Sequence, residues 1–430
     1  MRLCFLVYHG SMYSGGQGVY IHYLTRELAR LGHEVHVIAG PPYPTMAEGI
    51  QVHRLESFSW FRFVEDRRGF LDRPNPLQFF YPLNLFEFAS TRAGIFSLMF
   101  TFSLRAVAKF QELHRRHPFD IVHDNQGLGI GLLLIKSCGV PMVATIHHPL
   151  SIDARNAVAQ ATGAIEKARR LIYYPIFMQE FVARRLDRII TVSEASARMV
   201  ELAFALPRQQ MDVIYNGIDT DVFRPLEETK QPNDIICVSN SEDRTKGALY
   251  LLQALRRLRD STNYRLTFVD RPQQQLKLAP RLLRRYGLGS RVRFTGRVTT
   301  PQLVRHYCRA HMSVCPSLYE GFGLPAAEAM ACGLPVAATT GGALSEVVED
   351  GVTGILVPPA DARALADAID NLMRDAQLRQ RMGQAGRQRI LDKFNWRKAA
   401  LQTEAVYQRL CEPSLSAASA PVATPCDQPG

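Results

Sequence analysis

The sequence predicts an α/β protein with two doubly wound domains, each containing a parallel sheet covered by helices on both faces. Short continuous apolar runs, such as residues 3–8, are typical of strands that are buried on both faces. Between these runs apolar residues recur at helical spacing, and the alternation of strand and helix begins again near residue 234. A length of 430 residues is sufficient for two or three domains with large cores.

The composition is that of an ordinary globular protein, with 47% hydrophobic and 21% charged residues. The net charge of +11 favours anionic partners, but no zinc-finger, RNP or basic-zipper pattern is present, so we expect no nucleic-acid binding. The eight cysteines form no CxxC pair or His/Cys cluster, which predicts reduced cysteines and no zinc site. Without a signal peptide or an apolar run of bilayer length, the expected location is cytoplasmic.

The first half opens with a strand, a loop, a helix and a second strand at residues 34–39. The loop contains Gly15 and Gly16, but with Gly18 these glycines do not form the GxGxxG fingerprint of dinucleotide-binding proteins. A tight turn from strand to helix explains them without a ligand.

Residues 58–110 combine many aromatic side chains with arginines. Such a mixture is typical of surfaces that rest on lipid headgroups, and it suggests peripheral association with the inner face of an anionic membrane. The alternative, which we favour, is that most of these aromatic residues pack against the sheet of their own domain as core.

Residues 120–124, 141–147 and 187–192 are the next predicted strands. His147 falls at the end of the second of these, and ligands of open α/β sheets bind beyond the carboxyl ends of the strands. A histidine in this position can hydrogen-bond a sugar hydroxyl or a phosphate oxygen. The alternative is a histidine whose hydrogen bonds are satisfied at the start of a loop.

The second half repeats the pattern of alternating strands and helices. The expected strands cover residues 234–239, 264–270, 292–296, 312–315, 335–339 and 355–357. Helical spacing then predicts three closing helices at residues 361–374, 378–391 and 396–410. The tail from residue 412 is rich in Pro, Ala and Ser, and we expect it to be disordered.

The most informative segment covers residues 316–359. It contains Glu320 and Glu328, with seven residues between them, in the sequence EGFGLPAAE. The two glycines permit a tight bend that exposes backbone N–H groups, and Pro325 is typical of the first turn of a helix. A helix start also favours an anion such as phosphate, so this segment predicts a pocket for a polyhydroxylated, phosphorylated ligand. Alternatively, neither glutamate binds a ligand: Glu320 is a charged residue of a surface loop, and Glu328 interacts favourably with the dipole near the N-terminus of the helix.

This segment resembles the retaining, nucleotide-sugar-dependent glycosyltransferases of family 4, also called group 1. The likeness continues through residues 339–342, 346–348 and 351–354, and through the Asn-Gly-Ile-Asp motif that begins at Asn216. It implies the GT-B architecture, in which two Rossmann-like domains face each other across a cleft. The expected domains are residues 1–215 for the acceptor and 216–392 for the donor. A helix at 393–411 then crosses back, and a disordered tail follows at 412–430.

The resemblance also implies roles for individual residues. Glu320 would bind sugar hydroxyls, Glu328 the ribose and His147 the reaction centre, while Lys246 would hold the diphosphate. The remaining expected donor-binding residues are Gly15, Gly16, Asn216, Arg244, Arg297, Val298, Gly321, Phe322, Gly323 and Leu324. Glu320, Lys246 and His147 are the expected catalytic residues.

No metal or cofactor is expected besides the nucleotide diphosphate sugar, which is a co-substrate. Asp219-Thr220-Asp221 imitates the DxD metal motif of another glycosyltransferase fold, but the surrounding Asn-Gly-Ile-Asp frame indicates a loop. The acceptor is unknown and could be a glycan, a glycolipid or a small molecule.

The sequence departs from the family at one charged position. Members usually carry an arginine six residues before the lysine of the Lys-Gly pair, and here that position is Asn240. Either Arg244 supplies the second charge for the diphosphate, or Lys246 acts with backbone amides alone. An epimerase or hydrolase on the same fold, and a catalytically silent nucleotide-sugar-binding protein, are the two alternative functions.

Overall fold

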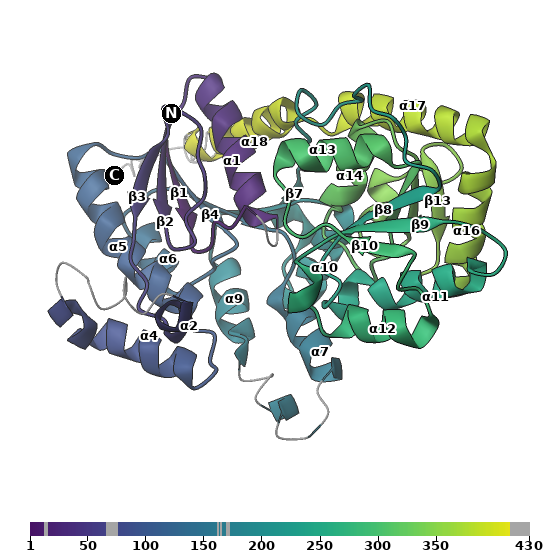
Figure 1. Cartoon of the computed structure of the whole chain (residues 1–430). Helices are drawn as coiled ribbons and strands as arrows, with labels where there is room; N and C mark the ends of the chain where they lie inside the picture. The colour runs from purple at the N-terminus through teal and green to yellow at the C-terminus, as the bar shows by residue number, and fades with distance from the viewer. Residues whose placement is uncertain (13–15, 66–75, 161–162, 164–165, 169–172, 413–430) are drawn as a thin grey trace, which may run out of the picture.

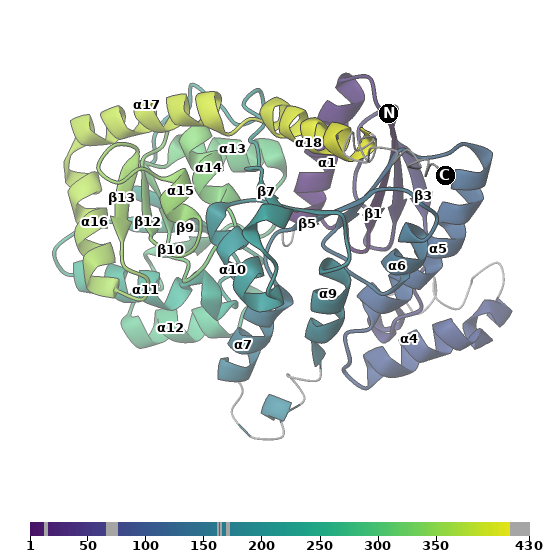
Figure 2. The same cartoon turned by 180° about the vertical axis from the view of Figure 1, so that it is seen from behind.

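The computed structural model describes residues 1–12, 16–65, 76–160, 163, 166–168 and 173–412. Within them lie two entirely parallel sheets (Figures 1 and 2), which confirms the predicted pair of doubly wound units. Gly15 and the predicted disordered tail beyond Glu412 lie outside the described residues.

The first sheet has seven strands in the order β3-β2-β1-β4-β5-β6-β7. They are β1 (Arg2–Val7), β2 (Glu34–Ala39), β3 (Gln51–Arg54), β4 (Ile121–Asn125), β5 (Met142–Ile146), β6 (Arg188–Thr191) and β7 (Met211–Val213). The second has six strands in the order β10-β9-β8-β11-β12-β13. They are β8 (Asp234–Val238), β9 (Arg265–Val269), β10 (Val292–Phe294), β11 (Met312–Cys315), β12 (Val336–Thr339) and β13 (Gly354–Val357).

Helices cover both sheets. Those that follow strands of the first sheet are α1 (Gln17–Arg30), α2 (Trp60–Glu65), α4 (Pro82–Arg92), α5 (Leu98–Arg116), α6 (Gly131–Lys136), α7 (Leu150–Gln160), α9 (Ile176–Ala183) and α10 (Glu194–Phe204). Those that follow strands of the second are α11 (Ala248–Leu258), α12 (Leu278–Tyr286), α13 (Thr300–Arg309), α14 (Leu324–Ala331), α15 (Leu344–Val347), α16 (Ala362–Arg374) and α17 (Ala376–Lys393).

The unbroken apolar run of β1 is explained by burial on both faces. Leu3 and Phe5 belong to the core cluster that includes Leu24 of α1, whereas Cys4 belongs to the cluster that includes Phe110 of α5. Successive side chains of a strand point to opposite faces, so a strand between two helical layers needs apolar residues at every position.

The last helix, α18 (Trp396–Cys411), packs along α1, and both views show the two side by side. His33, which follows α1, lies 2.9 Å from the carboxylate of Glu404, and the hydroxyl of Tyr407 hydrogen-bonds His123 of β4. The C-terminal helix therefore completes the helical layer of the first sheet.

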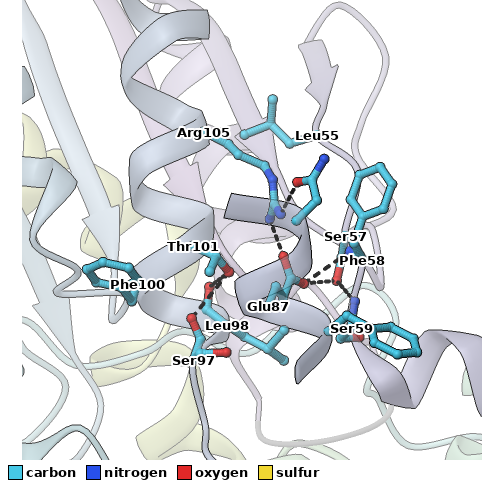
Figure 3. A network of polar contacts seen from close by, with 12 residues as sticks. Leu55, Ser57, Phe58, Ser59, Glu87, Ser97, Leu98, Phe100, Thr101 and Arg105 are labelled. Atoms are coloured by element: carbon cyan, nitrogen blue, oxygen red, sulfur yellow. Dashed lines mark hydrogen bonds and ion pairs between the residues drawn. The ribbon is translucent and has the colours of Figure 1, made fainter. Parts of the chain in front are cut away.

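The described parts of the aromatic segment between β3 and β4 form α2, the 3₁₀ turn η1 (Pro76–Phe80), α4 and α5, and residues 66–75 of this segment lie outside the described residues. Figure 3 shows how it is held together: the buried Glu87 of α4 forms an ion pair with Arg105 of α5. The Glu87 carboxylate also accepts hydrogen bonds from the hydroxyl of Ser57, at 2.5 Å, and from the backbone N–H of Phe58, at 3.2 Å. A buried carboxylate is tolerated because it is paired and hydrogen-bonded in this way.

Only part of this aromatic segment is core. Phe58, Phe102 and Phe110 are buried, whereas Phe80 and Phe86 are exposed. Within the described residues, no helix is both long and apolar enough to cross a membrane.

Candidate active site

The loops that follow β8 and β11 meet at the carboxyl edge of the second sheet. The backbone N–H of Leu318 donates to the carbonyl oxygen of Thr245 at 2.7 Å, which ties the two loops together. Gly247 adopts a left-handed conformation with φ of 70°, and a Cβ there would lie 1.9 Å from the carbonyl oxygen of Pro316. Glycine is therefore required for Lys246 to sit beside the second loop.

Lys246 and Glu320 form an ion pair in this junction. The ammonium of Lys246 lies 2.9 Å and 3.0 Å from the two carboxylate oxygens of Glu320, and the hydroxyl of Ser317 donates to the same carboxylate at 2.7 Å. Burial alone would lower the pKa of Lys246, but the charge and hydrogen bonds of Glu320 outweigh this and raise the pKa above its ordinary value. The lysine therefore stays positively charged.

The glycines that follow β12 pack against the backbone of Glu320. The carbonyl oxygen of Glu320 accepts the backbone N–H of Ala343 at 2.9 Å, and a Cβ on Gly342 would lie 2.2 Å from that carbonyl oxygen. The motif at residues 339–342 thus fixes the backbone of the Glu320 loop.

Glu328 lies in α14, which begins directly after Gly323. The hydroxyl of Tyr307 on α13 donates to its carboxylate at 3.1 Å. Burial raises the pKa of Glu328 to about 7, although the Tyr307 hydrogen bond acts in the opposite direction. The group is therefore partly protonated near pH 7, and its carboxyl oxygens have capacity for further hydrogen bonds.

His147 follows β5 and is 7% exposed. Its Nε2 lies 3.0 Å from Oδ1 of Asn125, whose amide nitrogen donates to the backbone of Gln17, so the histidine nitrogen is the donor. Its ring contacts Tyr20 edge to face, with centroids 4.8 Å apart. Burial, and less strongly the charge of His148, lowers the pKa of His147 to about 3. His147 is consequently neutral at pH 7, with Nδ1 as its acceptor.

Gly321 brings the second sheet's loop against His147. A Cβ on Gly321 would lie 2.7 Å from the carbonyl oxygen of His147, so only glycine permits this approach. The carbonyl oxygen of Gly321 accepts the Ser193 hydroxyl at 2.6 Å, and the Ser196 hydroxyl lies within hydrogen-bonding distance of the carbonyls of both His147 and Gly321. Three predicted catalytic residues, His147, Lys246 and Glu320, are therefore gathered around one junction.

A second contact between the two halves involves Glu346. Its carboxylate accepts the backbone N–H groups of Glu194, at 2.9 Å, and Ala195, at 2.7 Å, at the start of α10. It also accepts the hydroxyl of Tyr215 at 3.0 Å. A carboxylate at a helix N-terminus is stabilising, so Glu346 fastens α15 to α10.

The other predicted donor-binding residues are more dispersed. Gly16 approaches α14, since a Cβ on it would lie 3.2 Å from Leu324. Asn216 is buried, and its Oδ1 has no partner among the described residues. Arg297 is exposed, and Val298, in the loop after β10, packs on the core. The Phe322 side chain is buried, so only its backbone can reach a ligand.

The first aspartate of the DxD-like sequence, Asp219, stabilises the loop. The carboxylate of Asp219 pairs with Arg26 of α1 at 2.8 Å and accepts the backbone N–H of Asp221 at 3.2 Å. Over the described parts of the chain, no group of three or more His, Cys, Asp or Glu residues is arranged to hold a metal ion.

Comparison with known proteins identifies the family. Residues 14–222 match the pattern described as Glycosyltransferase Family 4, and residues 219–389 match that of Glycosyl transferases group 1. The MMP alpha-(1->4)-mannosyltransferase of Mycolicibacterium hassiacum is 37% identical over 416 residues, covering 95% of this chain and 98% of the relative. The chain belongs to the group 1 glycosyltransferases. Its function as a glycosyltransferase and the GT-B architecture predicted from the sequence are thereby confirmed.

Other group 1 relatives are more distant. The glycogen synthase of Mycobacterium tuberculosis is 28% identical, with 91% of each chain covered. Among solved structures, the sucrose-phosphate synthase of Thermosynechococcus elongatus gives a TM-score of 0.73 at 25% identity, covering 95% of this chain and 99% of that one. Anabaena HepE, solved in complex with UDP and glucose, gives 0.69 at 19% identity, with coverage of 95% and 99%.

Several polar residues at this candidate site were not predicted from the sequence. They are Asn125, Gln126, Ser193, Ser196 and Tyr307; Glu346 lies in the motif at residues 346–348, but no role was predicted for it. Gln126, for example, accepts the backbone N–H of His147 at 2.8 Å and has a φ of 58°. The signal available was position, because Asn125 ends β4 and Ser193 is the N-cap of α10 just after β6, both at the carboxyl edge of the first sheet.

Proposed function

We propose that this glycosyltransferase transfers a hexose from a nucleoside diphosphate sugar to an acceptor hydroxyl, with retention at the anomeric carbon and without a metal ion. The observation that carries the proposal is the Lys246–Glu320 pair, which lies across the junction from His147. A lysine charge can neutralise a departing diphosphate, and the carboxylate beside it can accept hydrogen bonds from sugar hydroxyls.

The remaining donor contacts follow from the same geometry. Glu328 would accept the ribose hydroxyls from within α14, and the backbone N–H groups after Gly321 would meet the sugar and phosphates. Asn216 would use its unpartnered oxygen on a donor hydroxyl. The structure of HepE with UDP-glucose supports a nucleotide sugar as donor.

His147 would act as a neutral hydrogen-bonding group. Its low pKa excludes a proton-donating imidazolium at pH 7, and its Nε2 proton is directed at Asn125. Nδ1 would therefore accept a hydrogen bond from a hydroxyl of the transferred sugar. The leaving phosphate would take the proton from the hydroxyl of the acceptor.

The name of the M. hassiacum relative directs the choice of substrates. We propose an α-linked hexose in the product, with mannose as the first sugar to test and a sugar hydroxyl as the first acceptor. The deciding experiment supplies an α-linked nucleoside diphosphate sugar, labelled in the sugar, with and without oligosaccharide acceptors and EDTA. We expect NMR to show an α-linked product, formed at the same rate with and without EDTA. A β product, a free sugar or epimer without transfer, or an activity that needs added magnesium or manganese would contradict the proposal.

We also propose that this enzyme rests on an anionic membrane through exposed apolar side chains of α2, η1 and α4, which we call the apolar ridge; α2 and α4 lie at the lower left of Figure 1. The ridge consists of the exposed side chains of Phe61, Val64, Leu77, Phe80, Tyr81, Leu85 and Phe86. Arg62 of α2 and Arg92 of α4 are also exposed, and the whole chain carries a net charge of +11. Apolar side chains beside basic ones match the headgroup region of an anionic bilayer, on its inner face.

A further inference from the structure

The loops after β8 and β9 are joined at the edge of the sheet that holds Lys246. Asp270, the residue after β9, has a side chain that is only 4% exposed and accepts the backbone N–H of Ser241 at 2.7 Å. Its other oxygen accepts the backbone N–H of Arg271 at 2.6 Å. The start of the Lys246 loop and the position of Arg271 are therefore fixed relative to each other.

The side chain of Arg271 is also oriented. Its Nη2 donates to Oδ1 of Asn240 at 2.9 Å, and the same oxygen accepts the backbone N–H of Glu242 at 3.2 Å. Arg271 also forms a long ion pair with Asp270, in which its Nε lies 3.9 Å from the carboxylate. A guanidinium carries five N–H donors, so most of this fork is available while a neutral amide holds its direction.

Arg244, the cation expected from the sequence, lacks such support. Its side chain is exposed, and the structure assigns it no hydrogen bond or ion pair within the described part of the chain. Fixing a free arginine on a ligand costs side-chain entropy, whereas Arg271 is already oriented by Asn240.

We propose that Arg271, together with Lys246, binds the diphosphate of the donor, and that Asn240 is its positioning residue. Both cations follow adjacent strands, β9 and β8, beyond whose carboxyl ends ligands of open α/β sheets bind. The guanidinium fork matches two phosphate oxygens, while Lys246 supplies a point charge. This inference rests on the proposed function and names the second cation of the same site.

The test measures binding rather than turnover. Isothermal titration with UDP, GDP, ADP and inorganic pyrophosphate would compare the wild type with Arg271→Gln, Arg244→Gln and a control, Arg257→Gln, which removes an exposed charge from α11. Glutamine retains an N–H group for Asn240 but lacks the charge. We expect Arg271→Gln to weaken nucleoside diphosphate and pyrophosphate binding by roughly tenfold to a hundredfold, with uridine or guanosine binding unchanged.

The other variants should bind like the wild type. Equal affinity of Arg271→Gln and Arg257→Gln, or a loss found only in Arg244→Gln, would overturn the proposal. A wild type that binds none of the nucleotides would instead contradict the proposed function.

Asn240→Ala tests the positioning role, and it also serves if Arg271→Gln does not fold. We expect a loss of roughly threefold to tenfold in nucleoside diphosphate affinity. In the Arg271→Gln background the same change should have no further effect, because the side chain that it orients is already absent. Additive losses, or wild-type affinity in Asn240→Ala, would show that Asn240 does not act through Arg271.

Discussion

The hydroxyl of Ser193 donates to the carbonyl oxygen of Gly321 at 2.6 Å, although these two residues belong to the loops of different sheets. Gly321 directly follows Glu320, and Ser196, near Ser193, contacts the carbonyl of His147. The contact therefore joins the carboxylate proposed to bind sugar hydroxyls to the histidine across the junction. The loops that carry Glu320 and His147 are therefore in direct contact in this structure.

Replacement of Lys246 by alanine should reduce kcat by about a hundredfold with saturating donor. The ammonium would no longer offset the charge on the departing diphosphate, and Glu320 would lose its partner. Steady-state kinetics would measure this against Lys277→Ala, which removes an exposed lysine. Similar turnover in the two variants would refute the role of Lys246.

Replacement of Glu328 by glutamine should change how stability depends on pH. Because burial raises the pKa of Glu328 from 4.5 to about 7, its contribution to stability is fully present below pH 4.5 and is lost as the pH rises through 7. Glutamine does not ionise, so Glu328→Gln should gain about 2 kcal/mol over the wild type between pH 5 and pH 8.

Urea denaturation at these two pH values would measure the gain in Glu328→Gln. The exposed Glu349→Gln is the control and should show no such change. A difference between wild type and Glu328→Gln that is the same at both pH values would mean that Glu328 ionises normally.

Replacement of Glu346 by alanine should loosen the contact between the two halves. Two backbone N–H groups of α10 and the hydroxyl of Tyr215 would lose their acceptor, at a cost of about 1 to 2 kcal/mol. We expect a lower urea midpoint and a higher donor KM than in Glu349→Ala, whose carboxylate pairs only at the surface with Arg389. An unchanged midpoint and KM would show that Glu346 does not fasten the halves.

Removal of two apolar side chains from the ridge should abolish membrane association. Phe80→Glu combined with Phe86→Glu places charges where the bilayer would contact α4 and η1. The wild type should co-sediment with vesicles containing anionic lipid at low ionic strength and be released by salt. Leu202→Glu, which alters an exposed leucine on α10, should sediment like the wild type. No sedimentation of the wild type would favour a soluble acceptor.

The sequence predicted those features that depend on local pattern. The apolar run at residues 3–8 identified β1 because a strand covered on both faces requires apolar side chains throughout. Glu320 and Glu328 could be found because the glycines and proline between them define a local bend. By contrast, the short edge strands β3 and β7 were not predicted, since β3 is partly exposed and β7 has only three residues.

The contacts that complete the site depend on residues far apart in the chain. The carboxylate of Glu346 contacts Ala195 at the start of α10, 151 residues away in the chain, and Arg26 of α1 contacts Asp219, 193 residues away. The link between Arg271 and Asn240 likewise requires β8 and β9 to pair in register. The spacing of residues within one segment cannot predict these contacts, because they form only when elements that are distant in the chain pack together.

The position of α18 has a consequence for the order of events during synthesis. This helix covers α1 and contacts β4 through Tyr407, yet in the sequence it follows every strand of the second sheet. The first sheet therefore emerges with one of its surfaces bare and remains so while the entire second sheet is translated. A nascent chain that stops before residue 396 would leave this apolar surface exposed to solvent. We expect aggregation or chaperone binding of such a chain to begin at this surface.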